Sequence, residues 1–175
     1  MKMKLLLILL ISALLAACGS SGNAEDSSAV DDTEDIKQLV EEYSGNTSVD
    51  GSASITSTEL IINDEEEERV YNLPEDEFFV SIAPYINETH PCTNHSLTGC
   101  QGELAGEDFE IYMEDSDGNV VVDETMNAES NGFVDLWLPR NETFQVKISH
   151  DGKEVESEIS TFEEDGTCVT TMQLM

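Results

Sequence analysis

The sequence predicts an α+β fold, in which a short N-terminal helix with a small β-sheet precedes a β-rich, antiparallel, sandwich-like C-terminal domain. Apolar residues occur at helical spacing over residues 33–43, whereas residues of high β propensity, later in strict alternation, recur after residue 52. Turn-forming Gly, Asn and Asp residues separate the later segments at short intervals. With 175 residues, 39% of them hydrophobic, the chain is long enough for one ordinary core or two small ones.

Residues 1–17 have the features of a lipoprotein signal peptide. Lys2 and Lys4 precede an apolar run of 13 residues, which spans about 20 Å as a helix against a hydrocarbon core of about 30 Å. The run ends in Leu-Ala-Ala-Cys, so we expect cleavage before Cys18 and lipidation of its sulfur. The sequence therefore predicts a bacterial lipoprotein, anchored to a membrane through Cys18 on its extracytoplasmic side.

Residues 18–34 form the predicted tether, rich in Ser, Gly, Asp and Glu and lacking large apolar side chains. The predicted N-terminal domain, residues 35–102, begins in a helix over Thr33 to Tyr43, where Ile36, Leu39 and Val40 share one face. Three strands are expected after it, and they cover residues 53–62, the surroundings of residues 70–71, and residues 78–85.

The predicted C-terminal domain, residues 103–175, shows the clearest strand pattern. Phe109, Ile111 and Met113 alternate with polar residues, and a turn at residues 117–119 follows. Five more strands are expected at residues 120–126, 134–138, 144–148, 154–161 and 168–174. Six short strands separated by turns predict an antiparallel sandwich.

The charge excludes several kinds of partner. Seven Lys and Arg residues against 38 Asp and Glu residues give a formal net charge of -31. Such a surface repels phosphate groups, so the sequence excludes nucleic acid and a polybasic membrane-binding patch. It also raises the local concentration of cations.

Three cysteines remain once the first is assigned to lipid: Cys92, Cys100 and Cys168. An odd number in an exported protein leaves at least one thiol that is unpaired, intermolecular or metal-bound. Two of the three lie in the segment HPCTNHSLTGC, together with His90 and His95. This crowding of sulfur and imidazole predicts a soft-metal site for Cu(I) or Zn(II), and the spacing of the residues does not decide between the two metals.

The predicted final strand adds a further candidate ligand. Period-two alternation from Cys168 puts Met172 on the same face, so that a thiolate and a thioether point the same way. Because a thioether is a soft ligand, Met172 favours Cu(I) over Zn(II).

Two other interpretations of the cysteines stay open. A disulfide between Cys92 and Cys100 would leave Cys168 as a buried free thiol, and an oxidising compartment favours such a bond. Alternatively, the cysteines could take part in thiol–disulfide exchange with a partner protein, although the sequence has no Cys-x-x-Cys motif.

The sequence resembles the CueP family of bacterial periplasmic copper-binding proteins. The matching stretches are residues 77–104, 131–153 and 159–174. The resemblance implies export, copper binding by three cysteines with a nearby histidine, copper resistance, and an N-terminal domain joined to a β-rich C-terminal domain. It further suggests a homodimer, copper supply to an extracytoplasmic superoxide dismutase, and disulfide-related chemistry. The family cysteines and histidine correspond here to Cys92, Cys100, Cys168 and His95.

Together, these observations predict a membrane-tethered, non-enzymatic protein that sequesters Cu(I) or hands it on, with Zn(II) as the less favoured occupant. The predicted ligands are Cys92, Cys100, Cys168, His95, His90 and Met172. A thiol–disulfide exchange protein of the cell envelope is the alternative function.

Overall fold

The structure is a computed structural model, and it describes residues 33–46, 48–64 and 67–175. The predicted signal peptide, Cys18 and nearly all of the predicted tether lie outside these residues. No helix among them is long and apolar enough to cross a membrane.

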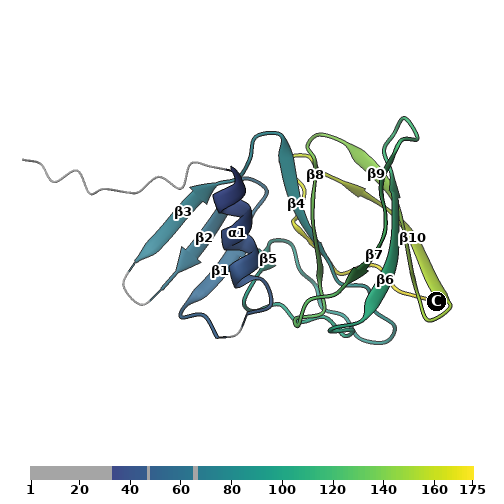
Figure 1. Cartoon of the computed structure of the whole chain (residues 1–175), viewed down its shortest axis with the longest axis horizontal. Helices are drawn as coiled ribbons and strands as arrows, with labels where there is room; N and C mark the ends of the chain where they lie inside the picture. The colour runs from purple at the N-terminus through teal and green to yellow at the C-terminus, as the bar shows by residue number, and fades with distance from the viewer. Residues whose placement is uncertain (1–32, 47, 65–66) are drawn as a thin grey trace, which may run out of the picture.

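The described residues form one helix and three β-sheets (Figure 1). The elements are α1 (Thr33–Tyr43), β1 (Ser52–Ile55), β2 (Glu59–Asn63), β3 (Glu68–Asn72), β4 (Glu77–Ile82), β5 (His95–Ser96), β6 (Asp108–Glu114), β7 (Val120–Asn127), β8 (Val134–Pro139), β9 (Thr143–His150), β10 (Lys153–Ser160) and β11 (Cys168–Val169). The predicted α+β class is wrong, because strands dominate the described residues. The helical spacing of apolar residues extends over only the 11 residues of α1, and every later element of the described chain is a strand.

The N-terminal sheet has the strand order β3-β2-β1-β5 and carries α1 on one face (Figure 1). Ile36 and Val40 of α1 are buried in one apolar cluster with Ile55 and Leu60 of the sheet. The single strand predicted over residues 53–62 is instead a hairpin of β1 and β2. Thr56 makes the turn, since its hydroxyl oxygen accepts a hydrogen bond from the backbone N–H of Glu59 at 3.0 Å.

A central sheet of order β11-β4-β8 lies between the N-terminal sheet and the C-terminal sheet β10-β9-β6-β7 (Figure 1). Phe78 of β4 belongs to the core shared with the C-terminal sheet, whereas Phe79 belongs to the cluster beneath α1. Because β4 is buried on both faces, its apolar residues run together without alternation. β4 lies in the predicted N-terminal domain and pairs with β8 in the predicted C-terminal domain, so the sandwich recruits a strand from outside residues 103–175.

The face of the central sheet toward α1 carries a partly buried carboxyl group. Asp135 of β8 accepts hydrogen bonds from two hydroxyl groups. One belongs to Ser44, which follows α1, and the other to Ser81 on β4. Burial raises the pKa of Asp135, and the two hydroxyl groups act in the opposite direction. Ser81 is also the register partner of Cys168, so this network ties the end of α1 to the strand pair that carries a predicted ligand.

Two glycines bring the chain after Cys100 against the start of β8. The N–H of Gly102 donates to the carbonyl oxygen of Asn131 at 2.6 Å. A Cβ atom on Gly102 would lie 2.5 Å from the carbonyl oxygen of Gly132, so a larger residue would force the two segments apart.

Candidate metal centre

Strand β5 and the turn after it position His95 and Cys100. His95 pairs with Ile55 of β1, and this pairing fixes the short strand to the N-terminal sheet. The chain then turns back, and the N–H of Cys100 donates to the carbonyl oxygen of Ser96 at 3.0 Å. In return, the backbone N–H of Ser96 donates a hydrogen bond to the sulfur of Cys100 at 3.4 Å.

Cys168 reaches the same place from the end of the chain. Strand β11 runs parallel to β4, and the N–H of Cys168 donates to the carbonyl oxygen of Thr93 at 3.0 Å. At Gly166 an added Cβ atom would lie 2.6 Å from that carbonyl oxygen, so the close approach of the two segments depends on a residue without a side chain.

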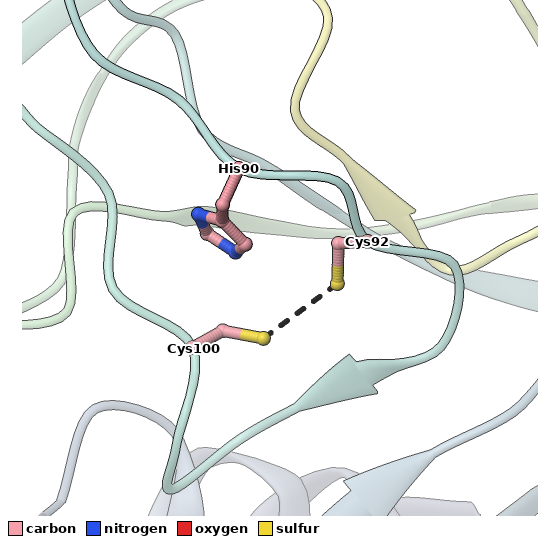
Figure 2. A group of neighbouring side chains, drawn as sticks. All are labelled: His90, Cys92 and Cys100. Carbon is pink, nitrogen blue, oxygen red and sulfur yellow. Dashed lines mark hydrogen bonds between the residues drawn. The ribbon is translucent and has the colours of Figure 1, made fainter.

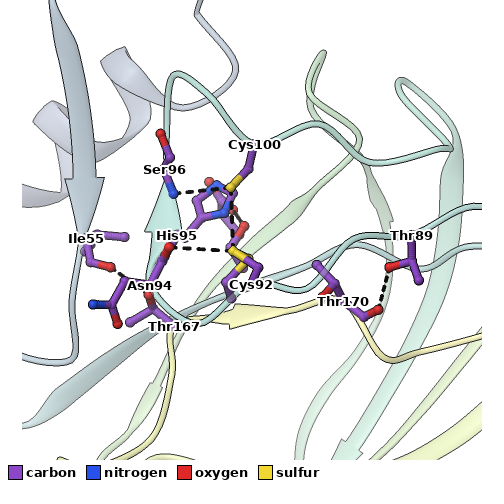
Figure 3. Close-up of a disulfide and its surroundings, with 12 residues drawn as sticks. Ile55, Thr89, Cys92, Asn94, His95, Ser96, Cys100, Thr167 and Thr170 are labelled. Atoms are coloured by element: carbon purple, nitrogen blue, oxygen red, sulfur yellow. Dashed lines mark hydrogen bonds between the residues drawn. A yellow bond between two sulfur atoms is a disulfide. The ribbon is translucent and has the colours of Figure 1, made fainter.

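The three cysteines that were predicted as metal ligands lie close together, and two of them are joined by a disulfide (Figure 3). Cys92 and Cys168 form a disulfide with their Cα atoms 5.6 Å apart, and Cys100 is a free cysteine. The sulfur of Cys100 lies 3.6 Å from that of Cys92. The structure therefore differs from the interpretation that paired Cys92 with Cys100, because the contact between β11 and the Thr93 segment brings Cys168 in from 76 positions away.

His95 is buried without a hydrogen-bond partner for its ring. Its side chain has 0% exposure, and neither ring nitrogen has a partner among the described residues. Burial, followed by the positive charge that His90 carries when protonated, lowers the pKa of His95 to about 4. The imidazole is therefore neutral at pH 7 and offers a nitrogen lone pair, which is the form that binds a metal ion.

The candidate ligands form two overlapping groups. The outer group is His90, Cys92 and Cys100, all partly exposed (Figure 2), and the inner group is His95, Cys100 and Cys168, of which His95 and Cys168 are buried. Within each group the ligand atoms lie within 4.8 Å of one another. Two atoms that bind one ion at about 2.3 Å each are at most about 4.6 Å apart, so small adjustments fit either group to a metal.

Phe133 encloses the site, although the sequence analysis did not identify it. Its ring is fully buried, with its centroid 4.4 Å from that of His95 and 6.3 Å from that of His90. It shares a small cluster with Ala83 and Cys168. The adjacent apolar residues Phe133 and Val134 could have indicated it. Neighbouring side chains in a strand face opposite sides, so only one of the two can belong to the sandwich core.

Glu103 holds the segment that leads into His90, and the sequence analysis missed it as well. Its carboxylate accepts hydrogen bonds from the N–H of Ile86 at 2.6 Å and from the N–H and side-chain amide of Asn87, both at 2.9 Å. These bonds, those from Asn87 first, lower the pKa of Glu103 to about 2.

The structure places Met172 away from the sulfur cluster. Strand β11 ends at Val169, so the alternation that would align Met172 with Cys168 does not continue. Met172 is fully buried in the sandwich core together with Phe78, whereas Cys168 belongs to the cluster around Phe133.

Three convergent sulfur atoms and a neutral, buried imidazole on a β-rich scaffold define a protein that binds soft transition metals. The chain belongs to the CueP family, described as periplasmic copper-binding protein CueP, whose family model matches residues 35–173. It is also similar to a solved structure titled "Crystal Structure of S.CueP", with 40% identity and a TM-score of 0.75. That match covers 80% of this chain and 88% of the other. No curated protein matches the sequence.

Membership of the family confirms the resemblance found in the sequence, and with it the expectations of copper binding and an extracytoplasmic, periplasmic location.

Proposed function

We propose that this protein is a tethered lipoprotein that binds Cu(I) through its reduced cysteines, withholds it from redox cycling and so contributes to copper resistance. The observation that carries the proposal is the convergence of Cys92, Cys100 and Cys168 beside His95, whose ring nitrogens have no partner among the described residues. The anchor at Cys18 would hold the protein at a membrane, where its acidic surface concentrates cations.

Full use of the sulfur atoms requires reduction of the disulfide. Two thiols of a reductant, from a small thiol or a dithiol protein, supply two electrons and two protons, so Cys92 and Cys168 become thiols while the reductant forms a disulfide. Each cysteine thiol then loses its proton when its sulfur binds the metal. The oxidised and reduced forms of the chain therefore differ in how many sulfur ligands they offer.

The donor set favours Cu(I) over Zn(II). Thiolates with imidazole suit both metals, but structural zinc sites are almost always tetrahedral with four ligands. Each group here offers three donors, and Cys100 is common to both. A three-coordinate arrangement rich in sulfur is therefore better matched to a cuprous ion.

Anaerobic titration of the reduced protein with Cu(I), in competition with a chelator of known affinity, tests the proposal. We expect Cys92→Ser, Cys100→Ser and Cys168→Ser each to weaken binding severely, since each removes a thiolate. His150→Gln is the matched control, because His150 contacts Phe109 and belongs to neither group. Unchanged affinity in all three cysteine variants would contradict the proposal.

A thiol–disulfide exchange function is the second candidate, and the 3.6 Å separation of the Cys100 and Cys92 sulfur atoms favours it. The thiolate of Cys100 would attack the sulfur of Cys92, forming a new disulfide and releasing Cys168 as a thiolate. Reduction of a model disulfide by the metal-free, reduced protein would support this function. A homodimer and copper transfer to a cuproenzyme such as superoxide dismutase are further proposals, tested by mass in solution and by reconstitution of the apo-enzyme.

A further inference from the structure

The two ligand groups overlap at one residue and differ in depth. Cys100 belongs to both groups, and it shares one with partly exposed ligands and the other with buried ligands. His90 and Cys92 complete the outer group, and His95 and Cys168 complete the inner group. One ion can therefore change group while a single thiolate stays bound.

We propose that the outer and inner groups are successive stations for one Cu(I) ion, which enters at His90 and is retained at His95. This inference rests on the proposed function and adds to it a direction and an order of ligands. Cys100 is the ligand that the ion keeps throughout.

The outer group is the accessible station. Its three residues, which Figure 2 shows together, are all partly exposed. The ring of His90 meets that of Phe133 edge-on, with their centroids 6.3 Å apart. An incoming donor molecule can therefore bring copper to the imidazole of His90 and the sulfur atoms beside it. The ring of Phe133, fully buried, also packs against His95, with the two ring centroids 4.4 Å apart.

The inner group is the station of greater stability. The ring nitrogens of His95 are buried without a partner among the described residues, and a buried polar atom left in this way is costly. Coordination to copper would satisfy one of them. Retention is further favoured because Phe133 packs against His95 and excludes water from it.

The transfer is an exchange of ligands without electron transfer. In the reduced protein, Cu(I) leaves the nitrogen of His90 and the sulfur of Cys92, and it binds the sulfur of Cys168 and the nitrogen of His95. As its sulfur binds, Cys168 loses its thiol proton, and the thiolate of Cys92 that leaves the ion takes up a proton, so the charge of the centre does not change. The sulfur that leaves and the sulfur that replaces it are neighbours, since they form a disulfide when oxidised. The ion moves a short distance and is never released.

Nitrogen NMR of the full, reduced chain with ¹⁵N-labelled histidine tests where copper rests. With one equivalent of Cu(I) added anaerobically, we expect the ring signals of His95 to shift and those of His90 to stay in place. In His95→Gln the shift should move to His90. Simultaneous shifts of both rings in the wild type, or a shift of His90 alone, would overturn the relay. No copper binding at all would instead contradict the proposed function.

Kinetics separate the stations in a second way. We expect His90→Gln to slow copper uptake from a chelator more than it weakens equilibrium affinity, whereas His95→Gln should lower affinity by at least about tenfold. His150→Gln should change neither. If His95→Gln fails to fold, as circular dichroism would show, the wild-type NMR result decides. Binding of two ions per chain at saturation would also overturn the relay, because both stations would then be filled together.

Discussion

Thr167 accepts a hydrogen bond from the backbone N–H of His95 through its hydroxyl oxygen, at 2.9 Å. The same hydroxyl donates to the carbonyl oxygen of Ile55 at 2.7 Å. Thr167 is buried and immediately precedes Cys168, so one side chain joins β1, β5 and β11. The position of the inner ligands relative to each other therefore depends on a residue that binds no metal.

Replacing Thr167 by valine should loosen the site. Valine has a similar shape and no hydroxyl group, so the N–H of His95 would be left buried and unpaired at a cost of about 1–3 kcal/mol. We expect a matching loss in the free energy of unfolding, measured with urea, and weaker binding of Cu(I) by the reduced protein. Thr167→Ser is the matched control, since it keeps the hydroxyl. Equal loss in both variants would show that the hydrogen bonds are unimportant.

The disulfide between Cys92 and Cys168 should stabilise the fold considerably. It spans 76 positions, and the chain-entropy treatment of a loop this long gives about 4.5 kcal/mol. We expect reduction to lower the free energy of unfolding by up to that amount, as judged by urea denaturation with and without a reductant. The Cys100→Ser variant should respond equally to the reductant. Alkylation followed by mass spectrometry should find Cys100 as the modified cysteine among the three, and labelling of Cys168 instead would contradict this pairing.

Glu103 should stabilise the protein in a pH-dependent way. Its hydrogen bonds lower the pKa in the folded state to about 2, against a usual value of 4.5, so the ionised form is favoured by folding. The contribution is complete above pH 4.5 and is lost as the pH falls towards 2. Denaturation of the wild type and Glu103→Gln at several pH values should therefore show a difference at pH 7 that shrinks across this window. A difference that is independent of pH would argue against the charge as its source.

Truncation of Phe133 should both destabilise the protein and open the metal centre. Phe133→Ala removes a fully buried ring, for which a loss of about 3–5 kcal/mol is typical. Since the ring covers His95, we also expect bound Cu(I) to be oxidised faster in air. Optical spectroscopy measures the rate of this oxidation. Phe133→Leu serves as the control, and it should retain more stability and more protection. Identical oxidation rates in both variants and the wild type would show that Phe133 does not shield the site.

Much of the local structure followed from the sequence. The apolar spacing of Ile36, Leu39 and Val40 predicted the helix, and its observed bounds, Thr33–Tyr43, agree. Alternation predicted the strands around Phe109 and Phe144 in the C-terminal sheet, because those strands bury one face only. The predicted α+β class was wrong, because the described residues form three β-sheets and only one short helix.

The sequence by itself also determined which chemistry is present: an odd set of cysteines, two histidines close to two of them, and membership of a copper-binding family. Neighbours in the chain must be neighbours in space, so the crowding of His90, Cys92, His95 and Cys100 was visible without a structure. Only the tertiary structure decided that Cys92 bonds to Cys168, that Phe133 covers His95, and that Met172 lies in another core. Those contacts depend on the pairing of β11 with β4 and on the β4–β8 pair, which bring together residues far apart in the sequence and leave no periodic signal in it.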